Sequence, residues 1–186
     1  MDGNSVALFV HIAGALGFFA ALGLEWTGLW QIRGATAPQQ VRGWMMILKS
    51  VRKVGFVFML TTVITGIYLM VTVWGGEPWI IATVGSLVLV IALAQVVTAP
   101  RMMAIGRALA TEKVPLSQTF YSLANHPLLW ISIQTRVALA LGIVFLKTAK
   151  PDLWGSLITI GVAIVLGLAS ALPVLRHEKA QEGLAD

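Results

Sequence analysis

Long stretches without a charged residue restrict the fold of this chain more than any other feature. Three of them cover residues 54–76, 79–99 and 153–175. A helix of about 20 apolar residues crosses the hydrocarbon core of a bilayer. Within lipid every backbone polar group must find its partner inside the protein, which helices achieve locally. The sequence therefore predicts an all-α membrane protein.

Two further segments complete a predicted bundle of five transmembrane helices. Residues 6–30 are apolar apart from Glu25, and residues 128–148 carry Arg136 near their middle. A mid-span arginine opposes insertion by about 2.5–3.5 kcal/mol, so the fourth helix has the weakest apolar signal. Only 11% of the residues are charged, against about 25% in soluble domains. We expect residues 1–186 to form one integral membrane domain, with the first helix retained because Asp2 replaces the basic start of a signal peptide.

The basic residues predict how the helices are oriented. Residues 31–53 hold five of them, residues 100–127 hold three and the tail 176–186 holds two, out of thirteen. Lys and Arg concentrate in cytoplasmic connections. With five helices these three segments lie on one side, which predicts an N-out/C-in protein of the bacterial cytoplasmic (inner) membrane. Tryptophans near the predicted span ends suit two interfacial belts; they are Trp26, Trp30, Trp44 and Trp130 on the basic side, and Trp74, Trp79 and Trp154 on the other.

The two long connections are predicted to be partly helical. Thr36 precedes Pro38, an arrangement typical of a helix cap followed by proline in the first turn. Ser117 resembles a second cap, and Pro127 marks a boundary. The basic stretch 42–53 suits an interfacial helix on anionic lipid, or a helix that continues into the second span. Neither arrangement needs a nucleic-acid partner to explain these basic residues.

Glu25 and Arg136 are expected at similar depth, near the cytoplasmic ends of the first and fourth helices. A lone charge in lipid is costly, and a pair is less so. We predict an ion pair between the two helices. It acts either as a packing clamp, which we favour, or as part of a proton relay.

His11 lies on a face of the first helix that it shares with Phe18 and Glu25 through heptad spacing. Such a face points into a bundle rather than at lipid. The histidine is either a hydrogen-bonded interface residue or a haem ligand. Met70 is predicted at matching depth, so a His/Met axial pair for haem b is one hypothesis. The chain has no cysteine and three scattered histidines, so we expect no metal site built from the chain's own side chains.

The fifth helix carries a stripe of small residues at four-residue spacing. Its members are Gly155, Thr159, Ala163, Gly167 and Ala171. Small residues let another helix approach closely. We predict packing inside the bundle, with Gly14, Gly17 and Ala21 as the facing surface. A homodimer or a larger membrane complex is the alternative.

Short motifs resemble a known family. His11-Ile-Ala-Gly, residues 65–69 (Thr-Gly-Ile-Tyr-Leu) and residues 145–153 are similar to the bacterial "predicted integral membrane protein" group. That group is distantly similar to copper-resistance-D and HemJ-type membrane proteins. The resemblance implies a small helical bundle with an early histidine, which in the HemJ type is associated with haem b. Only His11 carries over.

Three functions from different classes remain open. The favoured one is a non-enzymatic accessory or interaction subunit. The alternatives are a haem-b-binding redox protein that uses His11, and a small-solute or ion transporter with Glu25 and Arg136 along its path. The sequence contains no P-loop, GxGxxG, GxSxG or HExxH motif, so these motifs identify no catalytic residue and a non-enzymatic role is favoured.

Overall fold

The computed structural model describes the backbone of residues 2–182 and the side chains of residues 2–172. This part is helical apart from short connections. The elements are α1 (Gly3–Arg33), α2 (Pro38–Leu69), η1 (Met70–Trp74), α3 (Pro78–Ala92), η2 (Leu93–Thr98), α4 (Ala99–Ala108), α5 (Gln118–Ala124), α6 (Pro127–Ala149) and α7 (Leu153–Glu182).

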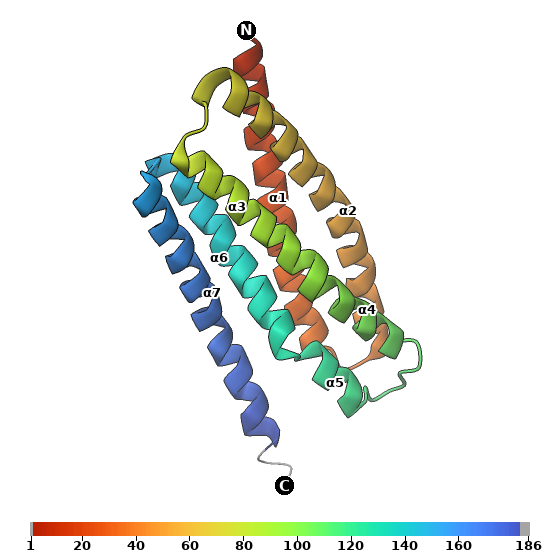
Figure 1. Cartoon of the computed structure of the whole chain (residues 1–186). Coiled ribbons are helices and arrows are strands. Elements are labelled where there is room, and N and C mark those ends of the chain that lie inside the picture. Colours follow the sequence, from red (N-terminus) through yellow and green to blue (C-terminus); the bar gives the residue numbers. More distant parts are fainter. Residues whose placement is uncertain (1, 183–186) are drawn as a thin grey trace.

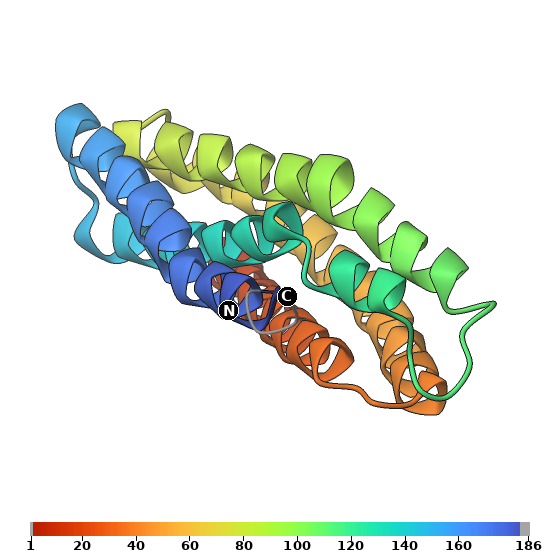
Figure 2. The same ribbon diagram turned by 90° about the horizontal axis from the view of Figure 1, so that it is seen from below.

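Five helical stretches are long and apolar enough to cross a membrane. They are Gly3–Arg33, Pro38–Trp74, Pro78–Ala108, Gln118–Ala149 and Leu153–Leu172. Together they run side by side along one long axis (Figure 1). Because their number is odd, α1 begins at one end of the bundle and α7 runs toward the other (Figure 1). Figure 2 shows the same helices from below. The predicted spans lie within these stretches apart from residues 75–76 of the second. Residues 173–175 of the predicted fifth span belong to α7, but their side chains lie outside the described part of the chain.

α1 packs against α2, and α6 packs against both α3 and α7. α6 is the most buried of the five spans. Burial among other helices explains how it can contain Arg136 although its apolar signal is the weakest. Its first turn begins at Pro127, where His126 is the N-cap, and α5 is capped by the Ser117 hydroxyl as predicted.

α2 is a single helix that starts well before the charge-free run. Its N-cap is Ala37 rather than Thr36, and Pro38 is its first residue. The Gln40 side chain accepts a hydrogen bond from the Thr36 backbone N–H at 3.0 Å. Residues 42–53 therefore belong to the same continuous helix as the second span. A separate interfacial helix, one of the two arrangements considered for this stretch, is not what the chain forms.

Two π-helical segments, η1 and η2, interrupt the long helices. In η2 the Leu93 carbonyl accepts a hydrogen bond from the Ser132 hydroxyl of α6 at 3.2 Å. The Thr98 hydroxyl lies 2.9 Å from the same Ser132 oxygen. These two contacts hold the η2 segment of the third span against α6. Segments of this kind are frequent at functional sites.

The small-residue stripe of α7 faces α6. A Cβ on Gly167 would lie 2.5 Å from the Thr135 Cα, and one on Gly142 would lie 3.2 Å from the Ala163 Cβ. Ala171 is buried and Thr159 is half-buried, whereas Gly155 has Pro151 and Asp152 of its own turn as its nearest neighbours. Gly155 is thus the stripe member outside the α6 contact.

The predicted facing surface on the first helix was wrong. A Cβ on Gly14 would meet Thr62, and one on Gly17 would meet the Phe58 ring. Ala21 lies against Gly55 in the same way. All three partners belong to α2, so the small residues of α1 bring α1 and α2 together and leave α7 to α6.

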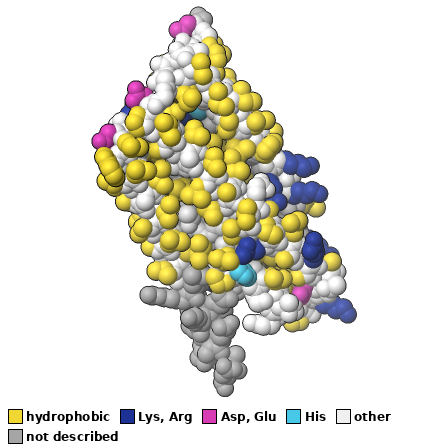
Figure 3. Space-filling view, viewed as in Figure 1, with side chains coloured by type: hydrophobic (Ala, Val, Ile, Leu, Met, Phe, Trp, Pro, Cys, Tyr) yellow, Lys and Arg dark blue, Asp and Glu magenta, His cyan; other side chains and the backbone are white. Residues whose placement is uncertain are grey.

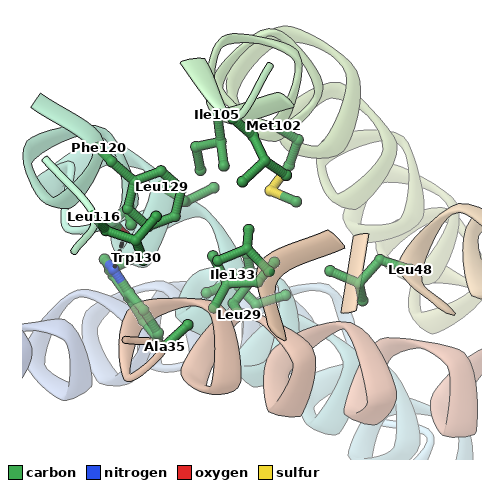
Figure 4. Close-up of a cluster of buried hydrophobic side chains, with 14 of the residues drawn as sticks. Leu29, Ala35, Leu48, Met102, Ile105, Leu116, Phe120, Leu129, Trp130 and Ile133 are labelled. Atoms are coloured by element: carbon green, nitrogen blue, oxygen red, sulfur yellow. Dashed lines mark hydrogen bonds between the residues drawn. The ribbon is translucent and has the colours of Figure 1, made fainter. Parts of the chain in front are cut away.

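A compact apolar cluster closes the end of the bundle where α1 ends, α2 begins and α4 and α5 lie; we call this the basic end (Figure 4). Trp130 is fully buried there and donates from its indole N–H to the Ala124 carbonyl at 3.0 Å. Its ring lies 4.8 Å from that of Trp30. Trp79, at the other end, is buried as well. Trp130 and Trp79 therefore lie in the protein interior rather than in an interfacial belt.

Apolar side chains cover most of the surface seen in Figure 3. Acidic side chains appear mainly toward the end where the chain begins, and Lys and Arg gather toward the basic end. Exposed leucines, isoleucines and valines are spread along all five spans. Such a surface suits lipid rather than water.

Candidate functional site

Ionisable side chains meet between α1 and α6 at two levels of the bundle. His11 contacts Lys147 near the end where the chain begins, and Glu25 contacts Arg136 closer to the basic end. Fourteen helical residues separate the two α1 positions, which is roughly 21 Å along the axis. The two contacts are therefore distinct centres.

Arg136 donates hydrogen bonds to Glu25 from both terminal nitrogens of its guanidinium group. Nη1 donates to Oε1 at 3.1 Å and Nη2 donates to Oε2 at 2.7 Å. Arg136 is 5% exposed. Two-pronged pairs of this kind are among the strongest polar contacts. The structure thus brings together the two residues that the sequence placed at matching depth.

A cavity of about 140 Å³ lies beside this ion pair. α1, α2, the α3–η2 segment, Met102 of α4 and Arg136 form its walls. Apolar side chains such as Phe18, Met59 and Val90 make up most of the lining, and Arg52 and Gln95 add polar groups to the same wall. The Arg136 Nε–H is buried and has no acceptor in the described part of the protein. The cavity is therefore largely apolar and lies beside the ion pair.

A groove between α2 and α4 adjoins the cavity. The groove has a volume of about 510 Å³ and shares Leu48, Arg52 and Met102 with the cavity. In Figure 4, Leu48 from α2 and Met102 from α4 reach toward the same space. Four methionines line the groove, and Met59 lines the cavity. Methionine side chains adapt easily to irregular ligands.

His11 uses both ring nitrogens within the bundle. Nδ1 lies 2.9 Å from the Thr62 carbonyl oxygen and 3.2 Å from the Thr65 hydroxyl. A carbonyl only accepts, so Nδ1 carries the hydrogen and Nε2 is the acceptor. Nε2 faces the Lys147 amine, which donates to it. His11 thus links α1 to α2 through one nitrogen and to α6 through the other.

This arrangement does not suit an axial haem ligand. The nitrogen that would bind iron is occupied by Lys147, and the ring edge at Cε1 would be 3.0 Å from a Cβ on Gly66. Met70, the predicted second ligand, is half-buried at the start of η1. The histidine is held as a hydrogen-bonded link between three helices.

Apolar side chains separate the two ionisable centres. Phe18 packs against a buried cluster that contains Val90 of α3 and Leu139 of α6. Among the described residues no group of three His, Asp or Glu side chains converges to hold a metal ion.

Sequence reasoning overlooked several members of these sites. Lys147 was not considered as a partner of His11, although it lies in the same predicted fourth helix as Arg136 and its depth matches that of His11 as well as the depth of Met70 does. Thr62 and Thr65 lie one turn apart on the charge-free second span, and threonine hydroxyls in such a span are a signal for an interhelical polar contact. Arg52 was grouped with the other basic residues because nothing local distinguishes it from Lys53.

Two polar contacts inside the bundle bear on its function. They comprise a two-pronged ion pair beside a cavity and a histidine that links three helices. No protein-family model, curated protein or solved structure matches the chain.

Proposed function

We propose that the chain is a multi-pass protein of the bacterial cytoplasmic membrane, oriented N-out/C-in, that serves as a non-enzymatic accessory subunit. Five apolar helical stretches support the membrane location. The orientation is supported by the basic end, where eight of the ten described Lys and Arg residues outside Arg136 lie on α1, α2, α4 and their connections. Basic connections stay in the cytoplasm.

The ion pair between Glu25 and Arg136 is the main support for the accessory role. A buried ion pair with two hydrogen bonds fixes the rotation of α1 against α6. The His11 contacts fix the same two helices at the other level. Ionisable groups inside membrane helices that are held by one another act as clamps. The result is a rigid bundle whose apolar outer faces remain available for neighbouring membrane helices.

The clamp is tested by a double-mutant cycle on the purified protein in detergent. Glu25→Gln or Arg136→Gln leaves one buried charge without a partner, so each is expected to lower the free energy of unfolding by about 3–5 kcal/mol. The double variant is expected to recover much of the loss. Lys53→Gln, which changes the same charge at an exposed α2 site, is the matched control. Additive losses in the double variant would contradict the clamp.

The accessory role is tested on membranes extracted with a polymer that retains lipid. Native electrophoresis is expected to show the wild-type chain in a complex much larger than its own 20.0 kDa. Each single clamp variant is expected to lose that complex, and the double variant is expected to regain it. A wild-type chain that migrates as a lipid-bound monomer contradicts the role.

Transport is the second candidate, because the ion pair lines a cavity. A transporter needs access to that cavity from both sides of the membrane in turn. Cysteine can be introduced at Ala21, which lines the cavity, in a chain that has no other cysteine. Transport predicts modification by a charged thiol reagent from either side. The accessory role predicts no modification from the side on which the chain begins, because Phe18 and Leu139 close that path.

A further inference from the structure

The cavity and the adjoining groove, taken together, make up a space with an uneven distribution of polarity. Deep in the bundle its walls are apolar, with Phe18, Met59 and Ile91. At the shared level lies Arg52, and beyond it toward the basic end lies Lys49. An occupant of this space would thus contact apolar groups at one end and cations at the other.

The positive charge along this space is not neutralised by the protein. Glu25 is the acidic side chain in the lining of this space, and both Glu25 carboxylate oxygens accept hydrogen bonds from Arg136. Among the described residues the Glu25–Arg136 contact is the only ion pair, so Arg52 and Lys49 have no carboxylate partner there. The buried Nε–H of Arg136 adds a donor without an acceptor. The lining therefore holds three cationic side chains, Arg52, Lys49 and Arg136, against one carboxylate.

We propose that this space binds an anionic phospholipid from the leaflet at the basic end. Arg52 and Lys49 hold the phosphate, the methionine-lined groove surrounds the glycerol region, and one acyl chain enters the cavity. The register of α2 on α1 supports this depth: Leu48 lies against Gly28 and Gly55 lies against Ala21, which places Arg52 level with Glu25 near the end of the first span. Basic pockets between membrane helices at this level are typical sites for anionic lipid headgroups.

The size of the space agrees with this occupant. The cavity of about 140 Å³ is close to one that accommodates a benzene ring, which corresponds to roughly six carbons of an acyl chain. The groove of about 510 Å³ accepts the phosphate and glycerol. This inference is independent of the accessory role, because it concerns a lipid rather than a protein partner.

The test is native mass spectrometry of the purified, delipidated chain titrated with defined lipids. Dioleoyl phosphatidylglycerol is expected to bind with higher affinity than dioleoyl phosphatidylcholine, which has the same chains and no net charge. Each basic residue at an anionic headgroup contributes about fivefold in affinity. Arg52→Gln and Lys49→Gln are each expected to weaken phosphatidylglycerol binding by about that factor.

Lys53→Gln is the matched control, because Lys53 is exposed on the same helix but lines neither the cavity nor the groove. It is expected to leave the affinity unchanged. Ala94→Leu fills the cavity wall without changing charge and is expected to weaken binding of phosphatidylglycerol. Arg52 is exposed, so its variant keeps the test valid even where the Ala94 variant does not fold.

Three results would overturn the proposal. Equal affinity for the two phospholipids would show that the site does not select an anion. An equal loss in Lys53→Gln and Arg52→Gln would show a diffuse surface charge effect rather than a built site. Displacement of phosphatidylglycerol by an equal concentration of oleate would assign the space to a free fatty acid.

Discussion

The Lys147 amine on α6 donates to Nε2 of His11 on α1, while Nδ1 of the same ring donates to the Thr62 carbonyl on α2. One imidazole therefore ties three helices together at the level opposite the basic end. The contact explains why a histidine and a lysine can both lie inside an apolar bundle. It also places Gly66 against the ring, since a Cβ there would be 3.0 Å from Cε1.

Removal of Lys147 is expected to weaken the bundle. Lys147→Met keeps the length of the side chain but leaves His11 Nε2 without a donor. Interhelical hydrogen bonds in membrane proteins contribute about 0.6 kcal/mol on average and up to ~1.7 kcal/mol. We expect a loss in this range in detergent unfolding experiments. In a cycle with His11→Phe, the double variant should lose less than the sum of the single variants, and a purely additive result would show that the two side chains do not interact.

Gly167 is expected to tolerate no side chain. A Cβ on Gly167 would lie 2.5 Å from the Thr135 Cα and 3.1 Å from its backbone nitrogen. Backbone atoms of α6 cannot rotate away, so Gly167→Ala must push α7 outward. Overpacking of this kind costs about 1–3 kcal/mol, which a lower midpoint of thermal unfolding would reveal.

Gly161→Ala on the same helix is the control for that experiment. No heavy atom lies within 4 Å of a Cβ at Gly161. Alanine is favoured over glycine inside a helix by about 1 kcal/mol, so this variant should be unchanged or slightly more stable. If both variants behaved alike, the close approach of α7 to α6 at Gly167 would be contradicted.

Single cysteines are expected to report the orientation of the chain. Gly76 and Gly43 are exposed, and neither has a heavy atom within 4 Å of an added Cβ. Because the natural chain has no cysteine, each variant carries one thiol. In intact cells a membrane-impermeant maleimide should label Gly76→Cys, and it should label Gly43→Cys only after the membrane is opened. The reverse pattern would contradict N-out/C-in.

The purified protein is expected to be colourless. The iron-binding nitrogen of His11 is engaged by Lys147, so haem would have to displace an existing partner. An absorption spectrum of protein expressed with excess haem should show no Soret band. A Soret band that disappears in His11→Ala but persists in His126→Ala would restore the haem hypothesis, since His126 instead caps α6.

Local properties of the sequence were enough to predict the spans and one of the polar contacts. Charge-free runs locate helices because transfer into lipid is a sum over neighbouring side chains. Glu25 and Arg136 could be paired by depth because each is a costly isolated charge in a membrane. Depth could not identify the partner of His11, because Met70 and Lys147 both lie at the same depth as His11. Depth gives no information about which face of a neighbouring helix turns inward.

Only the tertiary structure decided the partners across helices. The stripe of α7 was correctly seen as a packing face, but its partner is Thr135 and Gly142 of α6 rather than the glycines of α1. The η2 segment and the cavity beside Arg136 leave no local signal either. The sequence by itself determined which segments are helical and apolar, since these are properties of each segment alone. The rotation of each helix depends on close packing with all its neighbours at once, and that rotation placed Lys147 on His11 and left the space between α2 and α4 open.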